Sequence, residues 1–188
     1  MTILVTGAAG LIGSHLIDAL LKDGKIVHGL DNLKFGRVEN LKDALSFKNF
    51  SFIEEDVRNI ENNNTKYDAI YHLASLKKVW DGSIKSSDVM EVNYDMTRSV
   101  VSKCIKDNSS LIFTSTSDIY GNSESFLEDS DITMGAPGNT RYSYALSKWH
   151  SEQTILSDTI EKDLNASIAR IFGCASPRSN KGWSGGHV

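Results

Sequence analysis

The sequence contains little of what disulfide-rich, membrane-spanning or nucleic-acid-binding proteins need. Only two of its 188 residues are cysteines, Cys104 and Cys174, and their separation fits neither a disulfide framework nor a metal site. No apolar run approaches the roughly 18 residues that a membrane-spanning helix requires. The net charge of −4, without a Lys/Arg cluster, argues against a nucleic-acid surface. We therefore expect no metal, no membrane association and no nucleic-acid partner.

What remains is the composition of an ordinary globular protein. Hydrophobic residues make up 40% and charged residues 23% of the chain, and its 188 residues suit one domain with a sizeable core. Met1 is followed almost at once by an apolar run, which leaves no room for a signal peptide. Together with two cysteines that form no framework, this favours a cytoplasmic protein.

The stretch ILVTGAAGLIGSHL at residues 3–16 organises the rest of the chain. Residues 3–5 are a short apolar run typical of a buried parallel strand, and apolar residues recur with helical period further on. Gly7, Gly10 and Gly13 mark the turn from strand into helix. Without Cβ atoms, Gly7 permits the turn, Gly10 admits a diphosphate and Gly13 lets the helix lie close to the strands. The helix N-terminus then directs backbone N–H groups at the phosphates.

Asp31 completes the pattern of a dinucleotide-binding unit. It closes a second apolar run, residues 26–30, and lies 21 residues past Gly10. At the carboxyl end of a strand, its carboxylate can accept hydrogen bonds from both hydroxyls of an adenosine ribose and repels a 2′-phosphate. NAD is therefore favoured over NADP, although Arg37 lies near enough to weaken that preference. An ordinary tight turn between strand and helix is the alternative interpretation.

Strands and helices alternate along the whole sequence. Apolar runs predict strands at residues 3–5, 26–30, 50–54, 67–73, 111–113 and 166–172. Helical periodicity predicts helices after Gly10 and at residues 41–47, 86–107 and 141–163. This alternation predicts a Rossmann-like, doubly wound parallel β-sheet flanked by helices, with three α/β/α layers.

Three polar residues each allow a functional and a structural interpretation. Asp56 follows a predicted strand, where its carboxylate could meet the adenine amino group or cap a short helix. Asn93 lies on a different face of its helix from the apolar residues, and either bridges the backbone to a cofactor or is an ordinary polar position. His72 lies within an apolar strand, which favours a structural role over acid–base chemistry.

Tyr144 and Lys148 are the candidate catalytic residues. They lie four residues apart on one predicted helix and therefore share a face. A lysine ammonium beside a phenol lowers the pKa of the tyrosine, so that it can accept a hydroxyl proton near neutral pH. Thr116, at the hydroxyl-rich end of the fifth predicted strand, could bond the same substrate oxygen, and Lys148 could also hold the nicotinamide ribose.

The motifs TGAAGLIGSHL, YHLAS, FTSTSDIYG, YALSK and ARIFG occur in this order. Together with Asp31 they resemble the extended short-chain dehydrogenase/reductases, and among them the NAD-dependent nucleotide-sugar epimerases and dehydratases. The resemblance implies NAD as cofactor, a UDP-sugar as substrate and Thr116, Tyr144 and Lys148 as catalytic residues. It implies cofactor contacts at Gly7, Gly10, Leu11, Ile12, Gly13, Asp31, Asn32, Asp56, Val57, Leu73, Ala74, Lys77, Asn93, Tyr144, Lys148 and Phe172.

The reaction that the resemblance implies starts at the C4 hydroxyl of the sugar. Tyr144 removes its proton while the C4 hydride passes to NAD, and a 4-keto sugar forms. The LASLKKV stretch is similar to that of UDP-galactose 4-epimerases, in which this lysine, here Lys77, lies near the cofactor. Asp118 stands where 4,6-dehydratases and sugar-acid decarboxylases carry a glutamate, which is one methylene longer. We therefore expect a 4-epimerase, with a dehydratase or decarboxylase and an inert NAD-binding module as alternatives.

The resemblance also divides the chain. Residues 1–172 correspond to the NAD-binding domain of longer relatives, and residues 173–188 to the beginning of a truncated substrate-binding region. Gly173 stands where many relatives have an asparagine at the substrate edge. Relatives usually dimerise through the two long helices, here residues 86–107 and 141–163, so the resemblance implies a homodimer.

Overall fold

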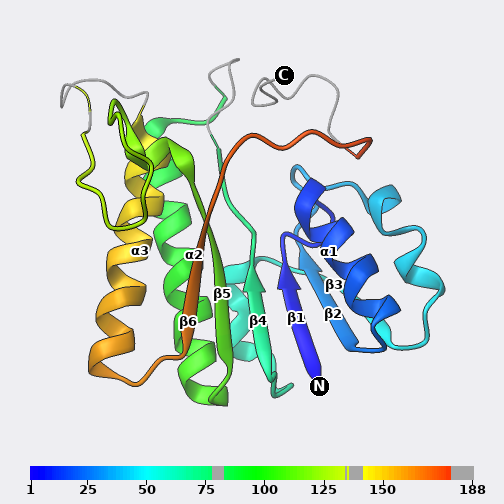
Figure 1. Cartoon of the computed structure of the whole chain (residues 1–188). Helices are drawn as coiled ribbons and strands as arrows, with labels where there is room; N and C mark the ends of the chain where they lie inside the picture. The colour runs from blue at the N-terminus through cyan, green and yellow to red at the C-terminus, as the bar shows by residue number, and fades with distance from the viewer. Residues whose placement is uncertain (78–82, 134, 136–141, 179–188) are drawn as a thin grey trace.

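Six parallel strands form one sheet in the computed structural model, which describes residues 1–77, 83–133, 135 and 142–178 (Figure 1). The strands are β1 (Thr2–Thr6), β2 (Ile26–Asp31), β3 (Phe50–Glu54), β4 (Ala69–His72), β5 (Ser110–Thr116) and β6 (Ala166–Ile171). The helices are α1 (Leu11–Lys22), α2 (Ser86–Asp107) and α3 (Ser143–Glu161), with 3-10 turns η1 (Val38–Leu41), η2 (Ala44–Ser46), η3 (Val57–Asn62) and η4 (Ser117–Tyr120). Their order in the sheet, β3-β2-β1-β4-β5-β6, confirms the predicted doubly wound fold.

The sheet carries a hydrophobic core on each face. Along β1, Leu4 packs with Val100 of α2 and Ile155 of α3, whereas Ile3 and its neighbours pack with Ile17 of α1. This alternation is expected of a strand covered on both sides. Figure 1 shows α1 beside β1–β3, and α2 and α3 together behind the other half of the sheet. In the described ranges, no helix is long and apolar enough to cross a membrane.

The helix predicted at residues 41–47 is wrong: two separate 3-10 turns, η1 and η2, occupy this region. The backbone N–H of Arg37 and the side-chain amide of Asn40 both donate to the carbonyl of Ala9, at 3.1 and 2.8 Å. These bonds hold η1 against the glycine turn. The other elements match their predicted positions to within three residues, and α3 begins at Ser143, with Tyr142 as its N-cap.

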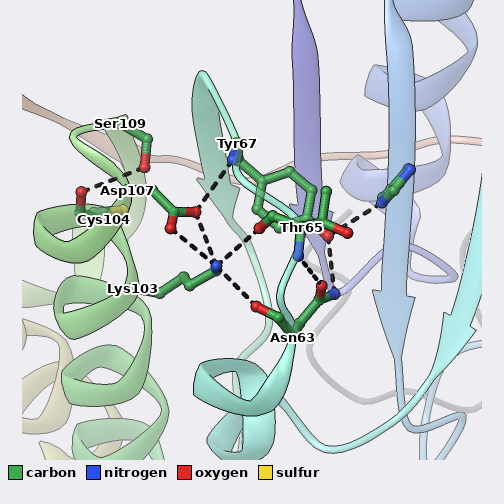
Figure 2. Close-up of polar contacts among 8 residues, drawn as sticks. Asn63, Thr65, Tyr67, Lys103, Cys104, Asp107 and Ser109 are labelled. Atoms are coloured by element: carbon green, nitrogen blue, oxygen red, sulfur yellow. Dashed lines mark hydrogen bonds and ion pairs between the residues drawn. The ribbon is translucent and has the colours of Figure 1, made fainter.

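A buried lysine joins α2 to the segment before β4, at the amino-terminal edge of the sheet (Figure 2). Lys103 is only 1% exposed and its amine bonds the carboxylate of Asp107 at 3.0 Å. The same amine donates to the carbonyls of Asn63 and Thr65 at 2.9 and 2.8 Å. Asp107 also accepts the backbone N–H of Tyr67 at 3.1 Å. This network fixes the edge of the sheet that lies opposite the candidate site.

Candidate active site

A cavity of about 480 Å³ lies at the carboxyl edge of the sheet. It is bounded by the turn after β1, the ends of β2, β4 and β5, the first turns of α3 and the segment that follows β6. In the sheet order, β1 and β4 lie side by side, and the chain continues from them to opposite faces. Open α/β sheets bind ligands at this kind of topological switch point.

The glycine turn forms the floor of the cavity between β1 and α1. Gly7 has φ +68°, and a Cβ atom there would lie 2.8 Å from the backbone nitrogen of Ala74. A Cβ atom on Gly13 would overlap the carbonyl oxygen of Gly7. Gly10 begins α1 without a side-chain cap, and the first N–H groups of a helix have no intrahelical partner. The turn therefore offers donors and positive helix-dipole potential to an anion such as a diphosphate.

His72 and Thr6 fix the backbone that approaches this turn. Thr6 Oγ1 accepts the N–H groups of Leu73 and Ala74, each at 3.2 Å, and lies 2.8 Å from Nδ1 of His72. Since the hydroxyl accepts two bonds, its own proton is directed to Nδ1 and the imidazole accepts it in the neutral form. Burial lowers the pKa of His72 to about 3, and the charge of Lys148 adds to the effect. This geometry fits the structural role that the sequence favoured for His72.

Asp31 lies at the end of β2, as predicted, and is 8% exposed. Its Oδ2 accepts the N–H of Ala9 at 3.0 Å and its Oδ1 accepts the N–H of Leu33 at 2.9 Å. Burial raises the pKa of Asp31, while these two backbone bonds oppose the rise. Each carboxylate oxygen keeps a further lone pair for a hydroxyl donor. Gly36 packs closely against the Asp31 carboxylate, because a Cβ atom at Gly36 would lie 2.8 Å from both carboxylate oxygens.

Asp56 caps η3, which is one of the two roles that the sequence left open. Its Oδ1 accepts the backbone N–H of Arg58 at 2.9 Å, and the Arg58 guanidinium pairs with the same carboxylate at 2.8 Å. The hydrogen bond from the Arg58 side chain is the main reason why the pKa of Asp56 is lowered. Asp56 also lines the cavity, so an adenine contact stays a prediction.

Tyr144, Lys148 and Thr116 meet at the same cavity. Lys148 is 2% exposed, its amine donates to the carbonyl of Thr114 at 2.8 Å, and it lies 6.0 Å from the centre of the Tyr144 ring. Burial lowers the pKa of Lys148 to about 7, and Glu152 opposes that effect. Thr116 Oγ1 accepts the N–H of Asp118 at 3.1 Å and so caps η4.

The expected lowering of the Tyr144 pKa is wrong for this structure. Burial raises the pKa of Tyr144, Asp118 adds to the rise, and the hydroxyl of Ser75 opposes it. The amine of Lys148 is directed at the Thr114 carbonyl, so desolvation of the phenol outweighs the attraction of the lysine charge.

The cavity brings together all but one of the predicted cofactor residues. The exception is Asn93, which does not line it. The amide of Asn93 instead bonds the N–H and carbonyl of Leu76 at 2.6 and 2.9 Å, and Ser147 at 2.9 Å. Leu76 does line the cavity, so Asn93 shapes the wall without reaching the interior.

Two serines of the cavity wall were not predicted. Ser115 Oγ is buried and has no hydrogen-bond partner in the described part of the chain, whereas the buried hydroxyl of Ser75 interacts with Tyr144. Both residues follow or end strands at the cavity edge, and that position was the only sequence signal for them. An unpaired buried hydroxyl favours a polar ligand. With the glycine turn and Asp31, the cavity therefore suits a dinucleotide.

Residues 173–178 cross from the end of β6 toward α1 (Figure 1). Arg178 pairs with Asp18 of α1 at 2.6 Å, and Ser176 Oγ lies 2.6 Å from Nε2 of His15. Gly173, Cys174 and Arg178 themselves line the cavity. The remainder of the predicted substrate-binding region, residues 179–188, lies outside the described residues.

The sheet order, the glycine turn and Asp31 define a dinucleotide-binding α/β domain. The chain belongs to the NAD dependent epimerase/dehydratase family, whose sequence profile matches residues 3–188. A UDP-N-acetyl-alpha-D-glucosaminuronate decarboxylase of Bacillus cytotoxicus is 33% identical over 95% of this chain and 56% of its own length. The chain therefore spans about half the length of this relative.

Solved structures agree with the family assignment. The UDP-N-acetylglucosamine 4-epimerase from Methanobrevibacter ruminantium has a TM-score of 0.86 and 28% identity, over 100% of this chain and 59% of the epimerase. The UDP-glucuronic acid 4-epimerase from Bacillus cereus, solved with NAD, has a TM-score of 0.79 and 28% identity, over 95% of this chain and 59% of that one. The family thus contains epimerases, dehydratases and decarboxylases that depend on NAD.

Proposed function

We propose that this chain is the NAD-binding part of a nucleotide-sugar 4-epimerase. The observation that carries the proposal is the meeting of Thr116, Tyr144 and Lys148 at the cavity that also contains the glycine turn and Asp31. A protein that only bound a dinucleotide would have no need of a phenol, an amine and a hydroxyl beside it. This argues against the alternative of an inert binding module.

In this proposal the first turn of α1 binds the diphosphate, and Asp31 binds the adenosine ribose. The remaining predicted cofactor contacts line the same cavity, except Asn93, whose effect passes through Leu76. NAD supplies the hydride acceptor and donor. Ser115 gains a partner for its unpaired hydroxyl when a polar ligand fills the cavity.

Tyr144 acts as the base toward the C4 hydroxyl of a UDP-sugar. Two lysine amines favour its phenolate: Lys148 lies 6.0 Å and Lys77 lies 5.5 Å from the ring centre. A positively charged nicotinamide would favour it further, against the burial that raises the pKa of Tyr144. Thr116 holds the same substrate oxygen. With NAD bound, Tyr144 would return this proton to the C4 oxygen as hydride reached the other face of the 4-keto sugar, which would give the epimer.

Decarboxylation or dehydration is the second candidate function. Asp118 lines the cavity close enough to influence the Tyr144 pKa, and a curated relative at 33% identity is a decarboxylase of a UDP-sugar acid. A carboxylate at this position could act next to the transient ketone. Because the side chain of Asp118 is short, epimerisation remains the preferred proposal.

We also propose a cytoplasmic homodimer that is built on α2 and α3. The two helices pack against each other, and apolar side chains remain exposed on them. Met90 is 44%, Trp149 38% and Ile160 84% exposed. Burial of such residues in a helix–helix interface would remove apolar surface from water.

Calorimetric titration with NAD tests the proposed function. We expect NAD to bind the wild-type chain, Asp31→Ala to weaken binding about 10- to 100-fold, as loss of charged hydrogen bonds does, and Gly10→Val to abolish it. Asp23→Ala, at the opposite end of α1, is the matched control and should bind normally. UDP-sugars are then added to the same cell, and the products decide between epimerase and decarboxylase. Failure of folded wild-type protein to bind NAD would contradict the proposal.

A further inference from the structure

We propose that Glu152 and Arg170 are a positioning pair that keeps the Lys148 amine at the cavity wall in its charged form. The inference rests on the proposed function, because it gives Lys148 a task that requires its charge. The pair lies behind the cavity wall, and neither residue lines the cavity.

Glu152 lies directly behind Lys148 on α3. Tyr144, Lys148 and Glu152 succeed one another at intervals of four residues, so they share one face of the helix. Glu152 is 1% exposed, and its carboxylate accepts Nη2 of Arg170 at 2.8 Å and Nε at 3.2 Å. A buried carboxylate costs free energy unless it is paired, so the bidentate contact with arginine explains how it is tolerated here.

Arg170 also connects Glu152 to the opposite wall of the cavity. Its Nη1 donates to the hydroxyl of Tyr120 at 3.2 Å and to the carbonyl of Glu128 at 3.1 Å. Tyr120 ends η4, the turn that begins at Ser117 and carries Asp118. One guanidinium therefore fixes β6, η4 and α3 relative to one another, and these elements position the catalytic candidates.

Among the charged groups of the described residues, Glu152 is the one that favours the charged form of Lys148. His72 on β4 and Tyr144 on α3 are the titratable groups that face it, and Lys77 after β4 and Asp118 on η4 act on Tyr144. His72 is neutral, whereas Glu152 counteracts the lowering of the Lys148 pKa by burial. Since burial brings the Lys148 pKa to about 7, a modest change in this support alters the charge at neutral pH.

The test measures the titration of Lys148 in the cofactor-free 188-residue chain by NMR of 13Cε-labelled lysine, with Lys148→Met to assign the signal. Glu152→Gln retains the volume of the side chain and removes its charge. We expect the Lys148 pKa to fall by about one unit, since an opposite charge has been lost and Arg170 is left uncompensated.

Asp158→Asn is the matched control, because Asp158 is another buried, ion-paired carboxylate on α3. It lies ten residues beyond Lys148, or about 15 Å along the helix, and should leave the titration unchanged. An unchanged or raised Lys148 pKa in folded Glu152→Gln would overturn the inference, as would an equal fall in the control. These titrations need no NAD, so their outcome does not depend on whether the proposed function is correct.

NAD affinity gives a second readout. If charged Lys148 holds the cofactor, the loss of affinity with rising pH should begin about one unit lower in Glu152→Gln than in the wild type. Equal pH profiles would contradict a role of the pair in cofactor binding.

Discussion

Two buried lysines lie at opposite edges of the same sheet and differ in how their charges are satisfied. Lys103 bonds a carboxylate and two backbone carbonyls at 2.8–3.0 Å (Figure 2). Among the residues that the structure describes, Lys148 donates to a single carbonyl, that of Thr114, and it lines a cavity. Both side chains are at most 2% exposed, so the difference does not come from burial.

The comparison separates a structural ammonium from a functional one. A buried charge with all its bonding capacity filled holds elements together and leaves nothing for a ligand. A buried amine with unused capacity, beside an unpaired hydroxyl in a cavity, is destabilised until a ligand or substrate supplies partners. Lys103 is therefore expected to contribute to folding and Lys148 to binding and chemistry.

The largest expected effect is a loss of stability when Lys103 is replaced, at the edge of the sheet opposite the cavity. Lys103→Met leaves Asp107 buried without its cation, which typically costs about 3–5 kcal/mol. We expect a loss of this size in the free energy of unfolding, measured with urea at pH 7. Lys106→Met, an exposed position on the same helix, should change the stability by less than about 0.5 kcal/mol. Similar losses in both variants would show that the network does not stabilise the fold.

The second-largest expected effect is a rise in the free energy of unfolding with pH, which comes from Lys148 at the cavity edge. The pKa of Lys148 is lowered to about 7 in the folded protein, below its ordinary value of 10.5. Between these values the unfolded chain binds more protons, so stability rises with pH. From pH 7 to 9 the gain from this group is about 2 kcal/mol. Lys148→Met should lack this gain, whereas Lys103→Met should retain it.

Measurements for this comparison should stop at pH 9. Burial raises the pKa of Cys104 to about 12, above its ordinary value of 9. At higher pH the unfolded thiol ionises while the folded thiol does not, so this group lowers stability as pH rises. A wild-type curve that is flat from pH 7 to 9, parallel to that of Lys148→Met, would contradict the lowered pKa of Lys148.

The parts of the site that the sequence predicted are those in which neighbouring residues carry the signal. The glycine turn and Asp31 lie within one strand–turn–helix–strand unit, and Tyr144 and Lys148 lie on one helix. Geometry inside such a unit follows from helical period and turn sterics. Strand alternation likewise predicted the fold, since parallel strands need crossover helices.

The sequence did not indicate the long-range polar pairs. Glu152 and Arg170 look like ordinary solvated charges on their elements until the fold brings β6 against α3. Lys103 likewise lies among charged residues of α2, and only packing against the segment before β4 buries it. Burial depends on tertiary neighbours, so local pattern also misjudged the pKa of Tyr144, which desolvation raises.

The smallest expected effect compares one tyrosine from each edge. Tyr67 is 1% exposed, and its hydroxyl bonds Asn63 at 3.0 Å and His28 at 3.1 Å. Tyr67→Phe leaves both partners without this bond and should lower the free energy of unfolding by about 1–2 kcal/mol. Tyr144→Phe removes a hydroxyl at the cavity wall, where its partner Ser75 can bond water instead, so the stability should stay within about 0.5 kcal/mol of the wild type.

Activity should rank the two tyrosine variants in the opposite order. Loss of a catalytic base typically reduces turnover about 10²- to 10⁴-fold, and Tyr144→Phe should lose activity to this extent where the wild type converts a UDP-sugar. Tyr67→Phe should retain it at temperatures where the protein is folded. If Tyr144→Phe destabilised the chain as much as Tyr67→Phe, its hydroxyl would hold the fold together, and the division between a structural and a functional edge would be wrong.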